Sequence, residues 1–328
     1  MHKRFFKSKI FKIITCIVIA LILVYTIGGG NYLVTFALKS SYSTGDVEPA
    51  STVGDSNKEI IKANKEEIKA RTAEWMESEA GNFNDIYVMT DDGLKLQGEV
   101  YLAKEKTDKW VIAVHGYREE AKNVYNLGYF YAEQGYNVLY PNLRGCGPSQ
   151  GKYIGMGWLD KKDMLKWIDC IIDTDPDAQI VLHGISMGGA TVMMTSGEEL
   201  PANVKAIVED CGYTTVWDIF SDELDYLFGL PDFPILYCAS VFSKIRAGYG
   251  FKEASSIDML KKCDTPMLFI HGSEDNFVRS GMVDVNFDAC SAPKEKLVVE
   301  GAGHGNSYLR DPDLYFKTVF DFLGKYVK

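Results

Sequence analysis

Short apolar runs alternate with longer segments of helical periodicity from about residue 84 to the end of the chain. The runs are three to five residues long, are rich in Val, Ile and Leu, and lie at 110–114, 137–140, 180–182, 204–208, 267–270 and 297–299. Segments with the spacing of helices lie between or after them, near 121–134, 158–173, 187–198, 254–262, 278–290 and 311–325. Such alternation is typical of an α/β domain, in which a mainly parallel sheet is covered by helices on both faces.

The segment that precedes these runs has a different pattern. Apolar and polar residues alternate over 86–88 and 94–102, on either side of the turn sequence Asp91-Asp92-Gly93. This arrangement predicts an antiparallel hairpin at the entry to the sheet. The predicted α/β domain therefore spans residues 84–328.

One stretch, residues 213–252, interrupts the alternation of strands and helices. It is rich in aromatic residues and is too long for an ordinary connecting loop. We expect a small helical cap inserted above the sheet, with aromatic side chains forming the walls of an apolar pocket. The alternative is additional core packing without a role in ligand binding.

The N-terminal region contains a run of 26 residues, 13–38, without a charged side chain. As a helix this run would be roughly 39 Å long, which exceeds the ~30 Å hydrocarbon core of a bilayer. Five basic residues lie within residues 1–12, and positive charge before a span favours a cytoplasmic N-terminus. We therefore predict a single-pass signal anchor over 13–38, loosened at Gly28–Gly30, with the α/β domain on the extracytoplasmic side of the cell membrane. A cleaved signal peptide and a buried core helix are the alternatives.

Two further segments connect this predicted anchor to the α/β domain. Residues 39–56 are rich in Ser, Thr, Gly and Asp, which predicts a linker. Residues 57–80 place Ile61, Ile68, Thr72 and Trp75 at intervals of seven, four and three, which predicts an amphipathic helix packed on the domain, although Asn64 interrupts its apolar stripe.

Charge and cysteine content exclude several classes of function. The chain carries a net charge of −10 although its first twelve residues are basic, so the remainder is strongly acidic and does not suit a nucleic-acid partner. Six cysteines lie outside the predicted anchor, with no CxxC motif and no Cys/His cluster. No metal site is therefore predicted, and the cysteines are either buried thiols or disulfides of unspecified pairing.

The candidate nucleophile is Ser186, in the sequence Gly184-Ile185-Ser186-Met187-Gly188-Gly189. This sequence lies between an apolar strand and a helical segment, where a glycine two positions before and after the serine permits a sharp turn. The turn presents the hydroxyl group at the carboxyl edge of the sheet, and the following helix directs its positive N-terminus toward developing negative charge.

A serine hydroxyl needs a general base, and His304 is the candidate among five histidines. It lies in a glycine-rich loop after the last strand, whereas His183 and His271 lie at strand ends and are expected to have structural roles. Asp275 follows the strand 267–270 and is the preferred orienting acid. Glu274 and Asp210 remain alternatives for that acid.

Along the chain, the predicted nucleophile, acid and base follow one another in the order Ser186, Asp275, His304. This order distinguishes one class of serine hydrolases from the others. In that class, two backbone N–H groups form the oxyanion hole. We expect these to come from Met187, directly after the nucleophile, and from Tyr117, in the loop after the strand 110–114.

Together these motifs resemble those of the α/β-hydrolase superfamily, and more narrowly those of bacterial membrane-anchored hydrolases with serine aminopeptidase-type domains. The resemblance covers about residues 84–327 and is carried by His115-Gly116-Tyr117, Asn142–Gly151, Gly184–Gly189, His271–Asp275 and Gly303-His304. It implies the α/β-hydrolase fold, a Ser-Asp-His triad and acyl transfer without a cofactor. One departure is Cys146, where many relatives have a histidine; it either lines the site or is a structural thiol.

We therefore predict a serine esterase that acts on a small-molecule or lipid-like ester, with an apolar group bound beneath the cap. A peptidase, lipase or thioesterase is the enzymatic alternative, since this fold supports all of them. An aminopeptidase would need acidic residues to bind an α-amino group, and Glu119-Glu120 or Asp222-Glu223 are available. A noncatalytic binding protein on the same scaffold is the alternative of another class.

Overall fold

The computed structural model describes residues 2–40 and 55–328. Within these ranges it describes the side chains of all residues except 2–8, 10, 18, 19, 21, 22, 55 and 56. Most of the predicted linker, 41–54, and the basic side chains of Lys3, Arg4 and Lys7 therefore lie outside the described part of the chain.

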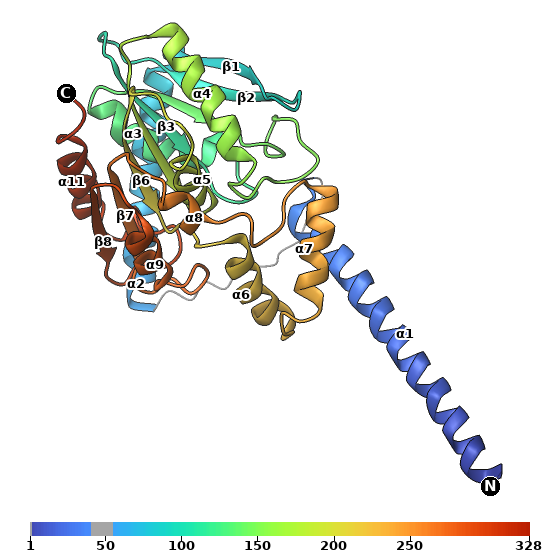
Figure 1. Ribbon diagram of the computed structural model, residues 1–328. Helices are drawn as coiled ribbons and strands as arrows, with labels where there is room; N and C mark the ends of the chain where they lie inside the picture. The colour runs from blue at the N-terminus through green and yellow to red at the C-terminus, as the bar shows by residue number, and fades with distance from the viewer. Residues whose placement is uncertain (1, 41–54) are drawn as a thin grey trace.

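The centre of the protein is a mixed, mostly parallel sheet, which confirms the α/β domain that the sequence predicts. Within the described residues it has eight strands in the order β1-β2-β4-β3-β5-β6-β7-β8 (Figure 1). The first two strands pair antiparallel across the predicted turn, β2 pairs antiparallel with β4, and every other pairing is parallel. The strands are β1 (Phe83–Met89), β2 (Lys95–Tyr101), β3 (Lys109–Val114), β4 (Asn137–Pro141), β5 (Gln179–Ile185), β6 (Val204–Asp210), β7 (Met267–Gly272) and β8 (Lys294–Val299).

Helices cover both faces of the sheet because successive residues of its apolar strands point to opposite sides. In β3, Val111 and Ala113 belong to one core cluster, whereas Ile112 and Val114 belong to the other. The first cluster includes residues of α2 (Asp55–Ser78), α3 (Tyr125–Glu133), α10 (Ser307–Arg310) and α11 (Pro312–Leu323). The second includes residues of α4 (Asp160–Thr174), α5 (Met187–Thr195), α8 (Ser256–Leu260) and α9 (Met282–Ala289).

Helix α2 occupies nearly the range of the predicted amphipathic helix and packs on the α/β domain. Ile61 and Ile68 are buried in the first core cluster, and Trp75 packs against it. Asn64, which interrupts the apolar stripe in the sequence, donates a hydrogen bond from Nδ2 to the backbone carbonyl of Leu309 at 2.8 Å. A polar residue is therefore accommodated in the packed face because it bonds a carbonyl group of α10.

The aromatic-rich stretch 213–252 contains two helices, α6 (Val216–Phe228) and α7 (Ile235–Arg246). Helix α6 begins at Thr215, whose hydroxyl accepts a hydrogen bond from the Asp218 N–H, and ends at Gly229 in the left-handed conformation. A bridge between Thr215 and Ser255 joins the two ends of the insertion. The helices project from the body of the domain on the side from which α1 leaves it (Figure 1).

Helix α1 runs from His2 to Leu38, and its last turns pack against α7 (Figure 1). The expected loosening at Gly28–Gly30 is wrong, since the helix continues through these glycines. A β-carbon at Gly30 would lie 2.7 Å from Cys238 Cβ and 2.8 Å from the Ala239 backbone nitrogen. The glycine at this position therefore allows α1 and α7 to approach closely, rather than ending the helix.

Across the residues whose side chains are described, no helix is both long enough and apolar enough to span a membrane. The predicted anchor, 13–38, includes positions 18, 19, 21 and 22, whose side chains lie outside the described set.

Candidate active site

Ser186 lies at the junction between β5 and α5, in a strained turn. Its backbone has φ 59° and ψ −118°, a conformation that costs a non-glycine residue roughly 1–3 kcal/mol and is common at functional sites. Close packing explains the flanking glycines, because a β-carbon at Gly184 would overlap the Gly188 carbonyl group and one at Gly188 would overlap that of Val114. The Ser186 N–H donates to the Asp210 carbonyl at 2.8 Å, which fixes the turn against β6.

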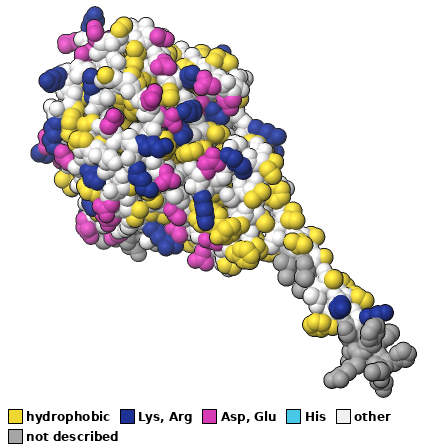
Figure 2. Space-filling view, viewed as in Figure 1, with side chains coloured by type: hydrophobic (Ala, Val, Ile, Leu, Met, Phe, Trp, Pro, Cys, Tyr) yellow, Lys and Arg dark blue, Asp and Glu magenta, His cyan; other side chains and the backbone are white. Residues whose placement is uncertain are grey.

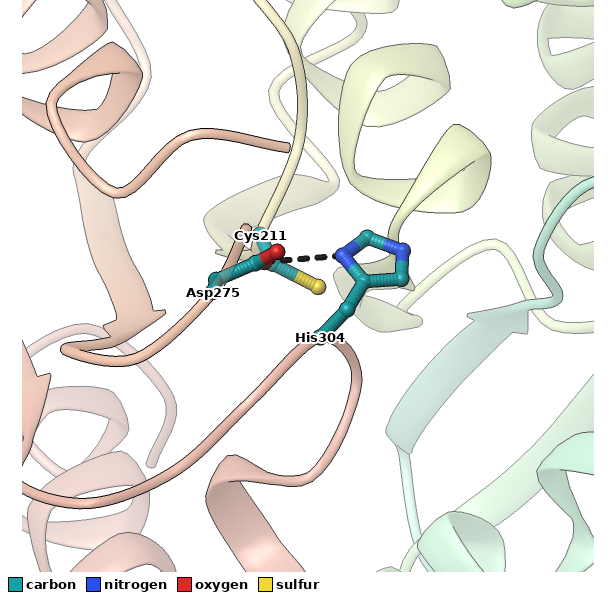
Figure 3. Close-up of side chains that lie close together, drawn as sticks. All are labelled: Cys211, Asp275 and His304. Atoms are coloured by element: carbon teal, nitrogen blue, oxygen red, sulfur yellow. Dashed lines mark hydrogen bonds and ion pairs between the residues drawn. The ribbon is translucent and has the colours of Figure 1, made fainter. Parts of the chain in front are cut away.

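Three of the predicted residues meet at this turn. The Oγ atom of Ser186 lies 2.7 Å from Nε2 of His304, and Nδ1 of His304 lies 2.8 Å from Oδ2 of Asp275. Figure 3 shows the imidazole ring and the Asp275 carboxylate facing each other across the second of these contacts. A carboxylate on Nδ1 leaves Nε2 free to accept the serine proton, as a general base requires.

The Asp275 carboxylate is buried and accepts hydrogen bonds at both oxygens. Oδ1 accepts from the backbone N–H groups of Phe277 and Val278, both at 3.0 Å. Oδ2 accepts from His304 and lies 3.2 Å from Nε2 of His271. Burial alone would raise the pKa of Asp275, but the contacts with His271 and His304 outweigh it and lower the pKa to about 2. The carboxylate is therefore ionised at neutral pH.

The alternative acids do not occupy this position. The buried Asp210 carboxylate accepts hydrogen bonds from the hydroxyl groups of Ser307 and Tyr315, at 3.2 and 3.0 Å. The carboxylate bonded to His304 belongs to Asp275 rather than to its neighbour Glu274.

The other buried histidines have structural partners. His183 contacts the hydroxyl groups of Tyr131 and Tyr315 within the core. His115 accepts a hydrogen bond at Nε2 from the Leu143 N–H at 3.0 Å, and burial lowers its pKa to about 4. His115 therefore connects the end of β3 to the loop after β4 as a neutral ring.

The two residues expected to form the oxyanion hole lie beside the nucleophile. Tyr117 and Met187 line the same cavity as Ser186, and a β-carbon at Gly116 would lie only 3.7 Å from Ser186 Cβ. Oε2 of Glu119 accepts a hydrogen bond from the Gly116 N–H at 2.8 Å, which curls the loop that carries Tyr117. Met187 is the first residue of α5, so its N–H points out of the helix N-terminus.

The cavity at Ser186 has a volume of about 740 Å³ and is assembled from distant parts of the chain. Apolar side chains from the cap and from the end of α1 form much of its wall: Leu33, Phe36, Ile219, Phe220, Leu224, Leu227, Phe228, Leu236 and Phe251. Polar residues of α2 and of the segment before α3 line another part, among them Lys65, Lys69, Lys122 and Asn123. The cavity therefore combines apolar and cationic regions around one serine.

Cys211, Asp275 and His304 form the cluster drawn in Figure 3, but their chemistry does not suit a metal ion. Both ring nitrogens of His304 already contact Ser186 and Asp275. Burial raises the pKa of the Cys211 thiol far above its ordinary value, so the thiol stays protonated. The seven cysteines all have free thiols, and Cys146 is buried in its loop. Cys146 does not belong to the described residues that line the cavity.

Comparison with known proteins agrees with the observed fold. Residues 109–243 match the family of the alpha/beta hydrolase fold. YqkD of Bacillus subtilis (strain 168) is 28% identical over 224 residues, which are 68% of this chain and 73% of that protein. YfhR of Escherichia coli (strain K12) is 22% identical over 240 residues, which are 71% of this chain and 77% of that protein. Both relatives are described as uncharacterized.

Three more comparisons concern one shorter sequence match and two solved structures. The human alpha/beta hydrolase domain-containing protein 17B is 37% identical over 65 residues, 20% of this chain and 23% of its own. The Pyrococcus furiosus esterase Pf2001 superposes with a TM-score of 0.62 at 23% identity, over 75% of this chain and 93% of that chain. The chain has the α/β-hydrolase fold. An acylaminoacyl peptidase from Pyrococcus horikoshii has the same fold, with a TM-score of 0.53 at 17% identity over 73% of this chain and 41% of that chain.

Some residues of the site were not indicated by the sequence and are identified only from the structure of this α/β-hydrolase fold. His271 contacts the same carboxylate oxygen as His304 while its Nε2 also contacts the Val278 carbonyl at 2.9 Å. Its position four residues before Asp275 is the only local signal. Leu33 and Phe36 of α1 line the cavity, and no pattern in the sequence connects them to Ser186.

Proposed function

We propose that this protein is a serine hydrolase that cleaves carboxylic esters through an acyl-enzyme intermediate. The observation that carries the proposal is the unbroken series of contacts from Ser186 Oγ through His304 to Asp275, at 2.7 and 2.8 Å. A strained backbone at Ser186 and a large cavity beside it accompany this series.

In the proposed reaction, His304 Nε2 takes the proton of Ser186 as Oγ attacks the ester carbonyl. The N–H groups of Met187 and Tyr117 stabilise the resulting oxyanion, and each such donor contributes about 10²–10³-fold to the rate. His304 then donates the proton to the leaving alcohol, and water repeats the sequence to release the acid. Asp275, with its pKa held at about 2, stays charged and stabilises the imidazolium that forms at each step.

Two features favour an ester with an apolar acyl group. The cap supplies a largely apolar wall, which suits an aliphatic chain better than a peptide backbone with its polar groups. The structural neighbour Pf2001 is named as an esterase, although its low identity supports only the shared fold.

A peptidase is the second candidate, because two carboxyl groups, those of Glu119 and Glu223, line the cavity. Burial raises the pKa of both, and that of Glu223 reaches about 7. Glu119 is also hydrogen-bonded to the Gly116 N–H. A carboxyl group that is partly protonated, or that already accepts a hydrogen bond from the protein, binds an α-ammonium group weakly. We therefore favour an ester over a peptide as the substrate.

A substrate panel distinguishes the two candidates. We expect the purified full-length protein to hydrolyse p-nitrophenyl esters with a kcat/KM at least about 100-fold above that for aminoacyl and acylaminoacyl p-nitroanilides. The Ser186→Ala variant should lose the ester activity, by about 10³-fold or more. Anilide turnover equal to or above ester turnover would replace the esterase with a peptidase.

We also propose that the protein is held at the cell membrane through the uncharged run 13–38, whose last turns pack on the cap, with the hydrolase domain on the extracytoplasmic side. The uncharged run and the basic residues before it support this placement. Exposed apolar side chains along α1, such as Phe11, Ile17 and Val24, are consistent with a lipid environment.

A further inference from the structure

The end of helix α1 is part of the wall of the candidate active site. Leu33, Phe36 and Ala37 line the cavity that contains Ser186, although about 150 residues of chain separate them from it. The Phe36 ring lies edge-on to that of Phe228, a cap residue in the same wall, with ring centroids 5.9 Å apart. Helix α1 and the cap therefore form one continuous apolar surface inside the cavity.

Polar contacts fix this end of α1 on the cap. The Arg246 guanidinium, at the end of α7, donates to the backbone and side-chain oxygens of Asn31, at 3.0 and 2.7 Å. It also donates to Oγ1 of Thr35 at 2.9 Å. Because Gly30 permits close approach on the same face, the helix is held to α7 by packing and by hydrogen bonds together.

The same turns of α1 are bonded to the loop that carries the proposed oxyanion donor. The Tyr117 hydroxyl donates to the Ala37 carbonyl at 2.5 Å, and the Arg118 guanidinium donates to the Phe36 carbonyl at 2.7 Å. The backbone at Phe36 is thus bonded to the loop that carries Tyr117, and its ring contacts the cap residue Phe228.

We propose that Phe36, supported by Leu33, is a specificity-determining residue whose ring sets the length of acyl chain that the cavity accepts. This proposal rests on the proposed esterase function and extends it to the acyl group. An acyl chain bound to Ser186 would extend between the cap and the end of α1, where Phe36 and Phe228 limit its path. The substrates are therefore esters of medium- to long-chain fatty acids, rather than acetate-like esters or compact aromatic esters.

The test compares two substitutions of opposite size with a control on the same helix. Phe36→Ala enlarges the cavity and Phe36→Trp reduces it, whereas Ile27→Ala removes an exposed side chain of α1 that does not line it. The measurement is kcat/KM for p-nitrophenyl esters from acetyl to palmitoyl. We expect Phe36→Ala to favour longer acyl chains and Phe36→Trp to favour shorter ones. The ratio of long-chain to short-chain kcat/KM should rise about tenfold in the first variant and fall about tenfold in the second. Ile27→Ala should retain the wild-type profile.

A binding measurement separates failure of this proposal from failure of the proposed function. In the Ser186→Ala background, fatty acids from octanoate to palmitate displace a fluorescent fatty acid, cis-parinaric acid, without any catalysis. If Phe36 sets chain length, its two substitutions move the preferred displacing acid in opposite directions, even if no ester is hydrolysed. Unchanged chain-length preference in both assays, with folded and equally stable variants, would overturn the role of Phe36 whether or not Ser186 is catalytic.

Discussion

At the scale of single residues, the charge state of Asp275 decides how His304 acts. A buried carboxylate normally resists ionisation, but four hydrogen-bond donors surround this one, two of them backbone N–H groups. Ionised Asp275 requires the proton of His304 on Nδ1, and Nε2 then faces Ser186 as an acceptor. His271 contributes one of the four donors, so it is a positioning residue for the acid.

Replacing Asp275 by Asn tests this assignment. The amide keeps the shape but removes the charge and favours the wrong tautomer of His304, so kcat should fall by about 10³–10⁴-fold with little change in KM. Glu274→Gln is the matched control, because it makes the same chemical change one residue earlier. Steady-state kinetics with a p-nitrophenyl ester measures both, and equal losses in the two variants would contradict the choice of Asp275.

A second prediction at this scale concerns Glu223, a carboxyl group in the otherwise apolar cap wall. Burial, and then the neighbouring Asp222, raise its pKa to about 7, so it is neutral below that pH and charged above it. Charge beside an acyl chain is unfavourable, and the ratio of long-chain to short-chain kcat/KM should fall about three- to tenfold as pH rises through 7. Taking the ratio removes any pH dependence that affects the two substrates equally.

The Glu223→Gln variant should have a ratio that does not change with pH. Asp222→Asn should keep the pH dependence but move it to lower pH, because the Asp222 charge helps to raise the pKa of Glu223 while Asp222 itself does not line the Ser186 cavity. A wild-type ratio that is flat from about pH 5.5 to about pH 8.5, roughly one and a half units either side of this pKa, would show that the charge of this carboxyl group does not affect binding of the acyl chain.

At the scale of elements, the sequence predicted the parts whose signals are local. The apolar runs became strands β3 to β8, and the turn at Asp91-Asp92-Gly93 became the β1–β2 hairpin. Ser186 could be identified because its strand, turn and helix are contiguous. Contacts between distant segments leave no such signal, so the attachment of α1 to α7 and to the Tyr117 loop could not be predicted.

The contact between α1 and α7 gives a prediction with a built-in control. At Gly30 a methyl group would collide with the backbone of α7, so Gly30→Ala should lower the free energy of unfolding by about 1–3 kcal/mol. At Gly28 nothing lies within 4 Å of the same methyl group. Because alanine favours helix, Gly28→Ala should be neutral or stabilising by up to about 1 kcal/mol. Thermal or urea unfolding of the full-length variants measures both, and equal effects would contradict this packing.

At the scale of the whole molecule, apolar surface is concentrated at one end. Figure 2 shows hydrophobic side chains gathered where α1 leaves the body, whereas charged side chains of both signs are scattered, with smaller hydrophobic patches, over the rest of the visible body. The cap helix α7, against which α1 packs, carries further exposed apolar residues, among them Val241 and Ile245. The cavity at Ser186 is therefore lined in part by the same two elements, α1 and the cap, that carry this exposed apolar surface.

This arrangement makes the proposed location testable in cells that express the full chain. We expect the protein to sediment with membranes and to stay there through carbonate extraction, with the domain accessible to protease from the extracytoplasmic side. Release of the protein by carbonate, or protection from external protease in intact spheroplasts, would contradict the proposed anchor or its orientation.

Reaction with a fluorophosphonate probe is the most direct test of whether Ser186 is the activated nucleophile. Such probes label a serine only when a neighbouring base activates it. We expect one adduct per chain, located at Ser186 by peptide mass spectrometry, and no adduct in Ser186→Ala. Equal labelling of the two proteins, or no labelling of a folded wild-type protein, would contradict this role of Ser186.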